Sequence, residues 1–300
     1  MAEKCRFPSY GGQAVIEGVL MRGARHMAIA MRDPNKVIVV HKEKLGGIYQ
    51  SRVAKIPFLR GLVMLWDSLG LGMRALTLSA NTQTGEEEKI EGPALYATMG
   101  VSILFAIALF FLAPAALGQL TEKYLGWNAW LGNLVEGLVR LAFLILYIAL
   151  IGRMAEIRRV FAYHGAEHKT INAFEAGVEL TPENVARHSV EHPRCGTAFL
   201  LTLVVMSIIL FALLGPLPTA WRLASRVLLL PVLAGLAYEY IRFTASHLDS
   251  PIIRLLVRPN LALQHLTTRE PSLDMLEVSI AAFNAMRAEE EKPVLEPAVL

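Results

Sequence analysis

Apolar residues gather in four blocks along the chain, and charged residues lie mostly between the blocks. A helix that crosses a bilayer needs about 20 predominantly apolar residues. The blocks cover residues 95–117 (within an uncharged stretch, 92–121), 131–151, 198–214 and 223–241. The pattern therefore predicts a mainly α-helical polytopic membrane protein with about four transmembrane helices.

Two of these blocks contain residues that are unusual in a membrane helix. Pro114 and Pro231 fall in the first and fourth blocks, where a membrane helix can tolerate proline. Glu136 and Arg140 lie four residues apart in the second block, so they share a helix face and can pair. We favour a paired charge near the interface or inside the bundle, and an ion pathway is the alternative.

The segment 57–76 is apolar except for Arg60, Asp67 and Arg74. Their spacing of seven residues places all three charges on one narrow helical stripe. This arrangement predicts an amphipathic helix over 56–80 that lies in the membrane interface. The alternative is a fifth crossing with its polar stripe turned inward, which would put the N-terminal region on the other side of the membrane.

Alternating residues mark the N-terminal region. Residues 26–32 alternate, and an Asp-Pro-Asn turn and residues 36–41 follow, which predicts a β-hairpin, and residues 14–21 can supply a third strand. We expect region 1–55 to form a small β-rich unit at the membrane surface. The string from Tyr10 to Gly23 also carries four glycines, which indicate tight turns or close backbone approach.

The C-terminal segment 271–291 reads as an amphipathic helix. Its acidic first turn, with Asp274 and Glu277, suits the positive end of the helix dipole. We expect the tail after Glu291 to be disordered.

Composition supports the membrane assignment. Hydrophobic residues make up 54% and charged residues 18%, with a mean hydropathy of +0.43, which is too apolar for an ordinary soluble domain. A net charge of +3 gives no sign of nucleic-acid binding. The N-terminus has no apolar run typical of a cleaved signal. Cys5 and Cys195 are too far apart in sequence to suggest a disulfide framework.

Basic residues set the expected orientation. Thirteen Lys and Arg precede the first block, six lie in 153–197 and six follow the fourth block, whereas the two other loops carry only Lys123 and Arg222. Cytoplasmic loops are enriched in Lys and Arg. Both termini and the loop 153–197 are therefore expected in the cytoplasm of a bacterial cell, in a multi-pass protein of its inner membrane. The regions expected are 1–55, 56–80, 92–152 (two spans), 153–197 (the cytoplasmic loop), 198–241 (two spans) and 242–300.

The loop 153–197 holds the residues that indicate chemistry. His164 and His168 are four apart, so both imidazoles lie on one helix face and can share a metal. With Glu167 they form H-x-x-E-H, the pattern in which two histidines hold zinc and the glutamate activates water. Glu167 is thus the candidate catalytic base. A histidine pair at this spacing also occurs on ordinary solvated helices, so both readings stand.

Three further residues are candidate ligands. Glu175 lies on the face of the histidine pair, seven residues beyond His168. His192 and Cys195 stand at the mouth of the third span, where a helix N-terminus lowers the pKa of a thiol. In the alternative reading, His192 only caps the structure and Cys195 is a small buried apolar residue.

Four strings of this chain resemble the YqhQ-like family of bacterial integral membrane proteins. They are YGGQAVIEGVLMRG, FAYHGAEHKTINAFE, HPRCGTAFL and LTTREPSLDMLEV, which together extend from Tyr10 to Val278. The resemblance implies a multi-span protein of the bacterial cell membrane, from a family of unknown function described as predicted metal-dependent enzymes. It supplies no reaction.

Three functions follow as expectations. The first is a zinc-dependent hydrolase, or one using another divalent metal, that acts at the cytoplasmic face on a lipid-linked or membrane-protein substrate. The second is a non-catalytic scaffold with a structural metal or polar site, which needs a closed ligand shell. The third is a transporter, which needs polar groups at mid-membrane. A homo-oligomer is compatible with all three.

Overall fold

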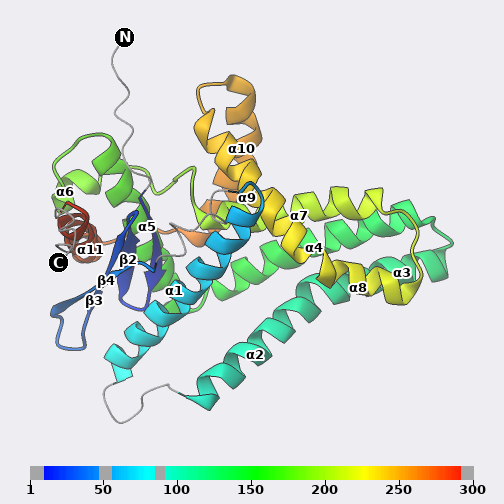
Figure 1. The fold of residues 1–300 in the computed structure, drawn as a ribbon, viewed down its shortest axis with the longest axis horizontal. Coiled ribbons are helices and arrows are strands. Elements are labelled where there is room, and N and C mark those ends of the chain that lie inside the picture. The colour runs from blue at the N-terminus through cyan, green and yellow to red at the C-terminus, as the bar shows by residue number, and fades with distance from the viewer. Residues whose placement is uncertain (1–9, 47–55, 85–91, 292–300) are drawn as a thin grey trace, which may run out of the picture.

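The computed structural model describes residues 10–46, 56–84 and 92–291, which are mainly helical with one small antiparallel sheet (Figure 1). The expectations for Cys5 and for the tail after Glu291 lie outside these residues, as does the boundary between the first two predicted regions.

The sheet is a four-stranded meander in the order β1-β2-β3-β4. Its strands are β1 (Gly11–Val15), β2 (Gly18–Arg22), β3 (His26–Arg32) and β4 (Ile38–Lys44). The predicted hairpin is confirmed as β3 and β4, with Asp33 bonded to Val37 across the turn. The third strand expected at 14–21 is instead two strands, because the chain reverses at Glu17, which has a positive φ of 53°.

The sheet is covered on both faces. Residues of β2 alternate between the faces: Val19 and Met21 pack against α5 (Ala155–Glu175) and α11 (Leu273–Glu290), whereas Leu20 packs towards α1 (Leu59–Thr84). The helix expected near the C-terminus is confirmed as α11. The loop expected at 153–197 contains α5, a helix buried in this core.

The long apolar helices form a second part of the molecule. One long helix consists of α2 (Pro93–Ile107), the π-helical turn η4 (Ala108–Leu112) and α3 (Ala113–Leu125), and it packs against α4 (Ala129–Ile151), which in turn packs against α7 (Gly196–Leu213). Among the described residues, three helices are long and apolar enough to cross a membrane: Leu95–Leu125, Ala129–Ile151 and Gly196–Leu213.

The fourth predicted span is bent. It consists of α8 (Thr219–Leu228) and α9 (Leu230–Ser246), which meet at 45° and make a fourth span only if they are counted together. Pro231 lies in the first turn of α9 and has no N–H to donate to the carbonyl of Val227. The fourth block expected over about 223–241 is therefore two helices in the structure, and it counts as a span only as this bent pair.

Pro114 has a different consequence. It has no N–H for the carbonyl of Phe110, four residues earlier, and that carbonyl accepts a 2.8 Å hydrogen bond from Arg140 Nε of α4. The neighbouring helix thus satisfies the group that the proline leaves free, as membrane helices require.

The pair in α4 belongs to a larger buried network. Glu136 accepts hydrogen bonds from Arg140 at 2.7 Å and from Arg226 of α8 at 2.7 and 2.8 Å. Arg222 lies 3.4 Å from Glu136 and 2.6 Å from Glu122. The paired-charge interpretation of Glu136 and Arg140 fits this geometry.

Two charges of the polar stripe of α1 form ion pairs with other elements. Arg60 pairs with Glu239 of α9 and Arg74 pairs with Glu43 of β4. The pKa of Asp67 is raised by burial, against the opposing effect of nearby Arg22. On the other side, Trp66 is 78% exposed. This helix is not among those long and apolar enough to cross a membrane.

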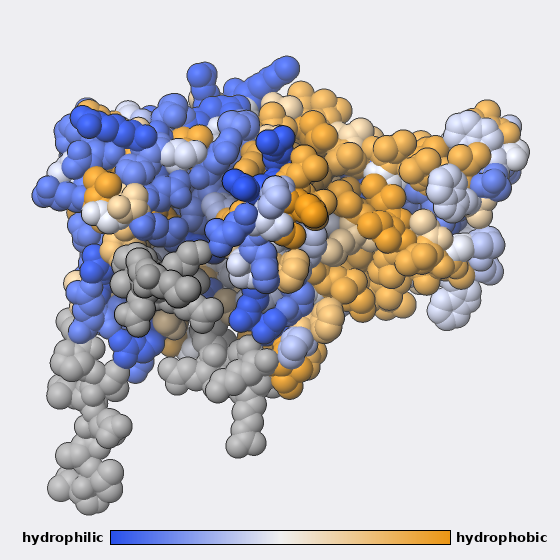
Figure 2. Space-filling model, turned by 90° about the horizontal axis from the view of Figure 1, so that it is seen from above, coloured by the Kyte–Doolittle hydropathy of each residue, from blue (hydrophilic) through white to orange (hydrophobic). Residues whose placement is uncertain are grey.

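The surface separates into two parts (Figure 2): a polar part around the sheet, here called the sheet end, and an apolar part that extends away from it to the far end. Exposed aromatic residues stand where the far-end helices begin and finish, among them Tyr124, Trp130 and Trp221. Such belts are typical of membrane–water interfaces. Helix α10 (Pro251–Thr267), for which the sequence analysis assigned no element, lies at the sheet end with Ile252 and Leu255 exposed.

Candidate metal centre

Helix α5 carries the histidine pair and presents it to the interior. His164 and His168 lie on one face, one turn apart, with ring centroids 4.4 Å from each other. His168 is 1% exposed, so the solvated-helix reading does not describe it. Gly165, between them, packs so closely on the carbonyl of Arg269 that a Cβ there would overlap it. The glycine lets α5 approach the segment that follows α10.

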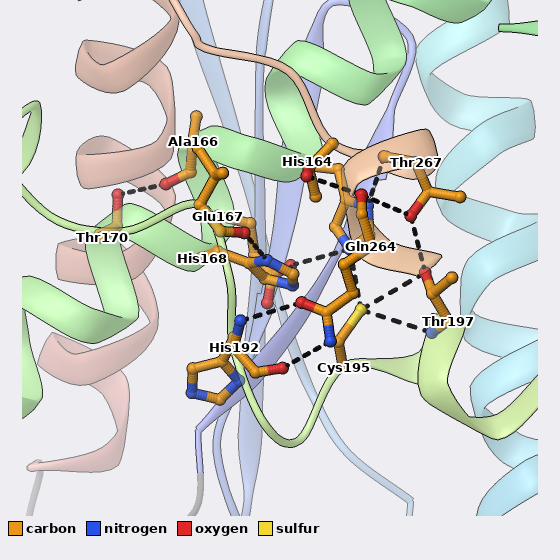
Figure 3. Close-up of polar contacts among 12 residues, drawn as sticks. His164, Ala166, Glu167, His168, Thr170, His192, Cys195, Thr197, Gln264 and Thr267 are labelled. Atoms are coloured by element: carbon orange, nitrogen blue, oxygen red, sulfur yellow. Dashed lines mark hydrogen bonds and ion pairs between the residues drawn. The ribbon is translucent and has the colours of Figure 1, made fainter. Parts of the chain in front are cut away.

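Cys195 joins the two histidines from a different element. It is the N-cap of α7, and its Sγ accepts a hydrogen bond from the N–H of Thr197 at 3.3 Å. His164, His168 and Cys195 each offer one ligand atom, and these atoms lie within 4.8 Å of one another. Figure 3 shows how the side chains converge from α5 and from the start of α7.

The spacing suits a tetrahedral zinc ion. Sγ of Cys195 lies 3.3 Å from Nε2 of His164. Zinc bound about 2.0–2.1 Å from nitrogen and about 2.3 Å from sulfur sets these atoms about 3.5 Å apart. Imidazole and thiolate are also donors that zinc prefers. The donor set therefore fits a zinc ion without a large movement of the chain.

Backbone carbonyls orient both imidazole rings. Nδ1 of His164 lies 2.9 Å from the carbonyl of Thr267, and Nδ1 of His168 lies 2.5 Å from the carbonyl of Val190. Each Nδ1 must carry the proton to donate these bonds, which leaves Nε2 with its lone pair as a metal donor. Histidine ligands of metals commonly have this second hydrogen bond.

Glu167 lies beside the three ligand atoms. Its Oε2 is 3.6 Å from Nε2 of His168 and 3.9 Å from Nε2 of His164. Burial raises the pKa of Glu167 to about 7, and the charge of His164 and a hydrogen bond from the N–H of Gly12 act in the opposite direction. A carboxyl group in this position can exchange a proton near neutral pH.

His192 lies next to the cluster. Its ring centroid is 5.6 Å from that of His168, and burial is the main cause that lowers its pKa to about 3. Gln264 holds the backbone of His192 through two 2.9 Å hydrogen bonds, one to its N–H and one to its carbonyl. The buried Nε2 of the His192 ring has no hydrogen-bond partner among the described residues.

Glu175 lies outside the three-residue group. It forms an ion pair with Arg194, and its Oε2 is 4.0 Å from Nε2 of His192. Of the five predicted ligands, the structure thus brings together His164, His168 and Cys195, places His192 beside them, and engages Glu175 elsewhere.

The sequence patterns did not assign a role to three residues that support the candidate metal centre: Gly12, Gln264 and Thr267. Gly12 lies in the glycine-rich string and Thr267 lies in LTTREPSLDMLEV, so the sequence singled out both segments. It did not indicate what the two residues do, because each contacts a residue that is distant in the chain. Thr267 contributes a backbone carbonyl, which carries no side-chain signal at all.

We expect Gly12→Ala to destabilise the protein by about 1–3 kcal/mol, the usual cost of overpacking. A Cβ on Gly12 would lie 2.6 Å from the carbonyl oxygen of Leu20 and 2.7 Å from Cγ of Glu167. Gly11→Ala is the matched control, because a Cβ there meets nothing within 4 Å. Thermal unfolding of the detergent-solubilised variants measures the difference, and equal stability would contradict the close packing of β1 on α5.

Comparisons with known proteins agree with the resemblance seen in the sequence. The chain is 36% identical over 299 residues to "Uncharacterized protein YqhQ" of Bacillus subtilis (strain 168), across 93% of this chain and 92% of that protein. No solved structure matches the chain. Residues 56–289 match the family model described as "Protein of unknown function (DUF1385)". This range includes every candidate ligand and most of the described helices, so the chain belongs to the DUF1385 family.

Proposed function

We propose that the protein is a zinc-dependent hydrolase that works at the cytoplasmic face of a bacterial cell membrane. One observation carries the proposal: three ligand atoms, from His164, His168 and Cys195, converge beside the buried carboxyl of Glu167. Catalytic zinc sites typically have three protein ligands and leave a fourth position open. An acid–base group within reach of that position is the other requirement of hydrolysis.

Each residue has a distinct part in this proposal. His164, His168 and Cys195 would hold the ion, which supplies Lewis-acid chemistry and makes water more acidic near neutral pH. Glu167 would accept the proton of the attacking water and return it to the leaving group. The backbone N–H of Gly12 in β1 donates a hydrogen bond to the carboxyl of Glu167 and holds this group on the side of α5 that faces β1.

A scaffold with a structural metal is the second candidate, and His192 favours it. The buried Nε2 of His192 has no hydrogen-bond partner among the described residues, and the ring is close to His168. A shift of the His192 loop would make it a fourth ligand and close the shell, as in structural zinc sites.

A transporter has less support. The charges between the membrane helices pair with one another, as Glu136 does with Arg140 and Arg226. Such pairs serve to hold helices together as well as to form ion pathways.

Glu167→Gln separates the hydrolase from the scaffold. The substitution keeps the size of the side chain and removes its basicity, so we expect unchanged zinc content and folding but no rescue of a strain that lacks the gene. Glu156→Gln, an exposed acid on the same helix, is the control and should rescue fully. Full rescue by Glu167→Gln would argue against hydrolysis and in favour of the scaffold.

The orientation rests on the excess of Lys and Arg at the sheet end. We expect a cysteine at exposed Glu183, in a Cys5→Ser background, to resist a membrane-impermeant maleimide in intact spheroplasts. A cysteine at exposed Thr219, at the far end, should react. Permeabilised cells provide the control for both positions. Labelling of Glu183→Cys from outside would reverse the proposed topology.

A further inference from the structure

A large apolar cavity lies between the membrane helices. Its volume is about 860 Å³, and its walls come from α1, from α2 with η4, and from α4, α7 and α9. Small-molecule sites usually occupy about 300–1,000 Å³, so the cavity is large enough for a ligand. It extends from Phe111 and Arg140, near the middle of their spans, to Leu200, near the sheet end of α7.

The wall is suited to hydrocarbon. Arg140 is the one charged residue in the lining, and it is 1% exposed. Its guanidinium donates to Glu136, to Ser207 and to the carbonyl of Phe110. Because these partners engage it and burial hides it, the cavity presents almost only carbon atoms to an occupant.

The cavity continues towards the candidate metal centre. Leu200 follows Cys195 by five residues on α7, which is about 7.5 Å along a helix. Ile148 and Val204 line the cavity and also belong to an apolar cluster against which Phe161 and Leu266 pack. Phe161 lies one turn before His164, and Leu266 precedes the residue whose carbonyl orients His164. The same apolar cluster therefore contacts both the wall of the cavity and the segments that position the ligands.

The lining argues for a lipid chain, because the walls present almost only carbon atoms to an occupant. The volume of about 860 Å³ lies within the range of small-molecule sites, and a flexible hydrocarbon chain can adapt to an irregular apolar cavity.

Exposed cations lie on α9, which lines the cavity, and on α10, which does not. Arg242 follows the cavity-lining part of α9 by two turns, and Arg254 and Arg258 are exposed on α10. Basic residues at a membrane surface attract anionic lipid headgroups. An apolar cavity together with these cations matches the two ends of an anionic lipid.

We propose that the cavity holds the hydrocarbon chain of an anionic membrane lipid whose polar head reaches the cluster of His164, His168 and Cys195. The inference rests on the proposed function, because it names the substrate class of that site. The substrate would enter from the leaflet at the sheet end and keep its tail between α1 and the bundle while its head meets Glu167.

Photolabelling of the full-length protein tests this arrangement. The protein is reconstituted in vesicles of phosphatidylethanolamine and phosphatidylglycerol that contain a trace of phosphatidylglycerol with a diazirine in one acyl chain. A second preparation carries the diazirine on the headgroup. We expect the tail probe to label the cavity-lining segments of α1 and α7 severalfold more than outward-facing Leu146. The head probe should label the segments around Cys195 and Thr267.

Ala106→Trp fills the cavity from α2 and should lower the tail labelling severalfold. Ala97→Trp, at an exposed position of the same helix that does not line the cavity, is the matched control and should leave it unchanged. Zinc content measured on the same samples shows whether each variant is folded around its centre. If Ala106→Trp loses zinc, the variant is not folded around its centre, and a second probe replaces it in the test. This probe is the same lipid with a tail too short to reach the cavity, and it should label the cavity-lining segments no more strongly than Leu146.

Three results would overturn the inference: tail labelling spread evenly over the lipid-facing residues, head labelling away from Cys195 and Thr267, or a stoichiometric partner protein that excludes the probe. These failures are distinct from failure of the proposed function. Absence of zinc, or full rescue by Glu167→Gln, would remove the hydrolase and leave the labelling pattern to decide whether a lipid occupies the cavity.

Discussion

Protein purified without chelators or a polyhistidine tag is expected to carry about one zinc ion per chain, and the double variant His164→Ala, His168→Ala is expected to carry none. The pair supplies both nitrogen donors, and the carbonyls of Thr267 and Val190 orient the two rings for this task. With both removed, the sulfur of Cys195 remains as a single ligand, which cannot hold the metal through purification. Elemental analysis of the purified protein gives the stoichiometry directly.

The control is a double variant of two other histidines, His247→Ala with His265→Ala. Both are exposed and lie outside the cluster, so the variant should keep its metal. Wild-type protein without any transition metal would contradict the prediction and remove the main support of the hydrolase.

The zinc content and stability of His192→Ala then show whether the fourth coordination position of the metal is open or filled by a protein ligand. If the site has three protein ligands, as the hydrolase requires, this variant keeps its zinc, because His192 lies outside the group of three. If His192 closes the shell, the variant loses affinity and stability together, as expected of a structural site.

Glu136→Gln is expected to destabilise the protein by about 3–5 kcal/mol, the usual effect of removing one partner of a buried ion pair. Glu136 is 1% exposed and lies within 3.4 Å of nitrogen atoms of Arg140, Arg222 and Arg226. Glutamine is neutral, so the variant leaves three cations side by side between the apolar helices, and of the three Arg222 keeps the carboxylate of Glu122 as a partner. Their mutual repulsion opposes the packing of α4 against α8.

Glu122→Gln provides the comparison, because Glu122 is 25% exposed and pairs with Arg222 at the edge of the network. We expect a much smaller loss of stability there. Unfolding midpoints in mixed detergent measure both variants. Equal stability of Glu136→Gln and wild type would show that the network is not a structural support, and the transporter would then gain weight.

Local patterns in the sequence determined the helices and the hairpin. A run of apolar residues has to be helical in a bilayer because every backbone group must be satisfied within the segment, so α4 and α7 were predictable within a few residues. Strict alternation identified β3 in the same way. The spacing of His164 and His168 is also local, since the turn of one helix brings them together.

Other elements depended on contacts that no local pattern contains. The reversal at Glu17 divides one predicted strand into two, although the residue there is not glycine. The break before Pro231 divides one predicted span. Arg60 of α1 pairs with Glu239 of α9, and Arg74 pairs with Glu43 of β4 at an exposed position, so the charged stripe also holds the helix against the protein.

The sequence by itself determined that this chain has helices long and apolar enough to cross a membrane and that it carries two histidines able to share a metal. Only the tertiary structure decided which other residues join them: Cys195 does, Glu175 pairs with Arg194, and Gly12 places a backbone N–H on Glu167. The physical reason is the range of the interactions. Helical and strand periodicity act over a few residues, whereas the metal centre is assembled by packing between segments that lie far apart in the chain.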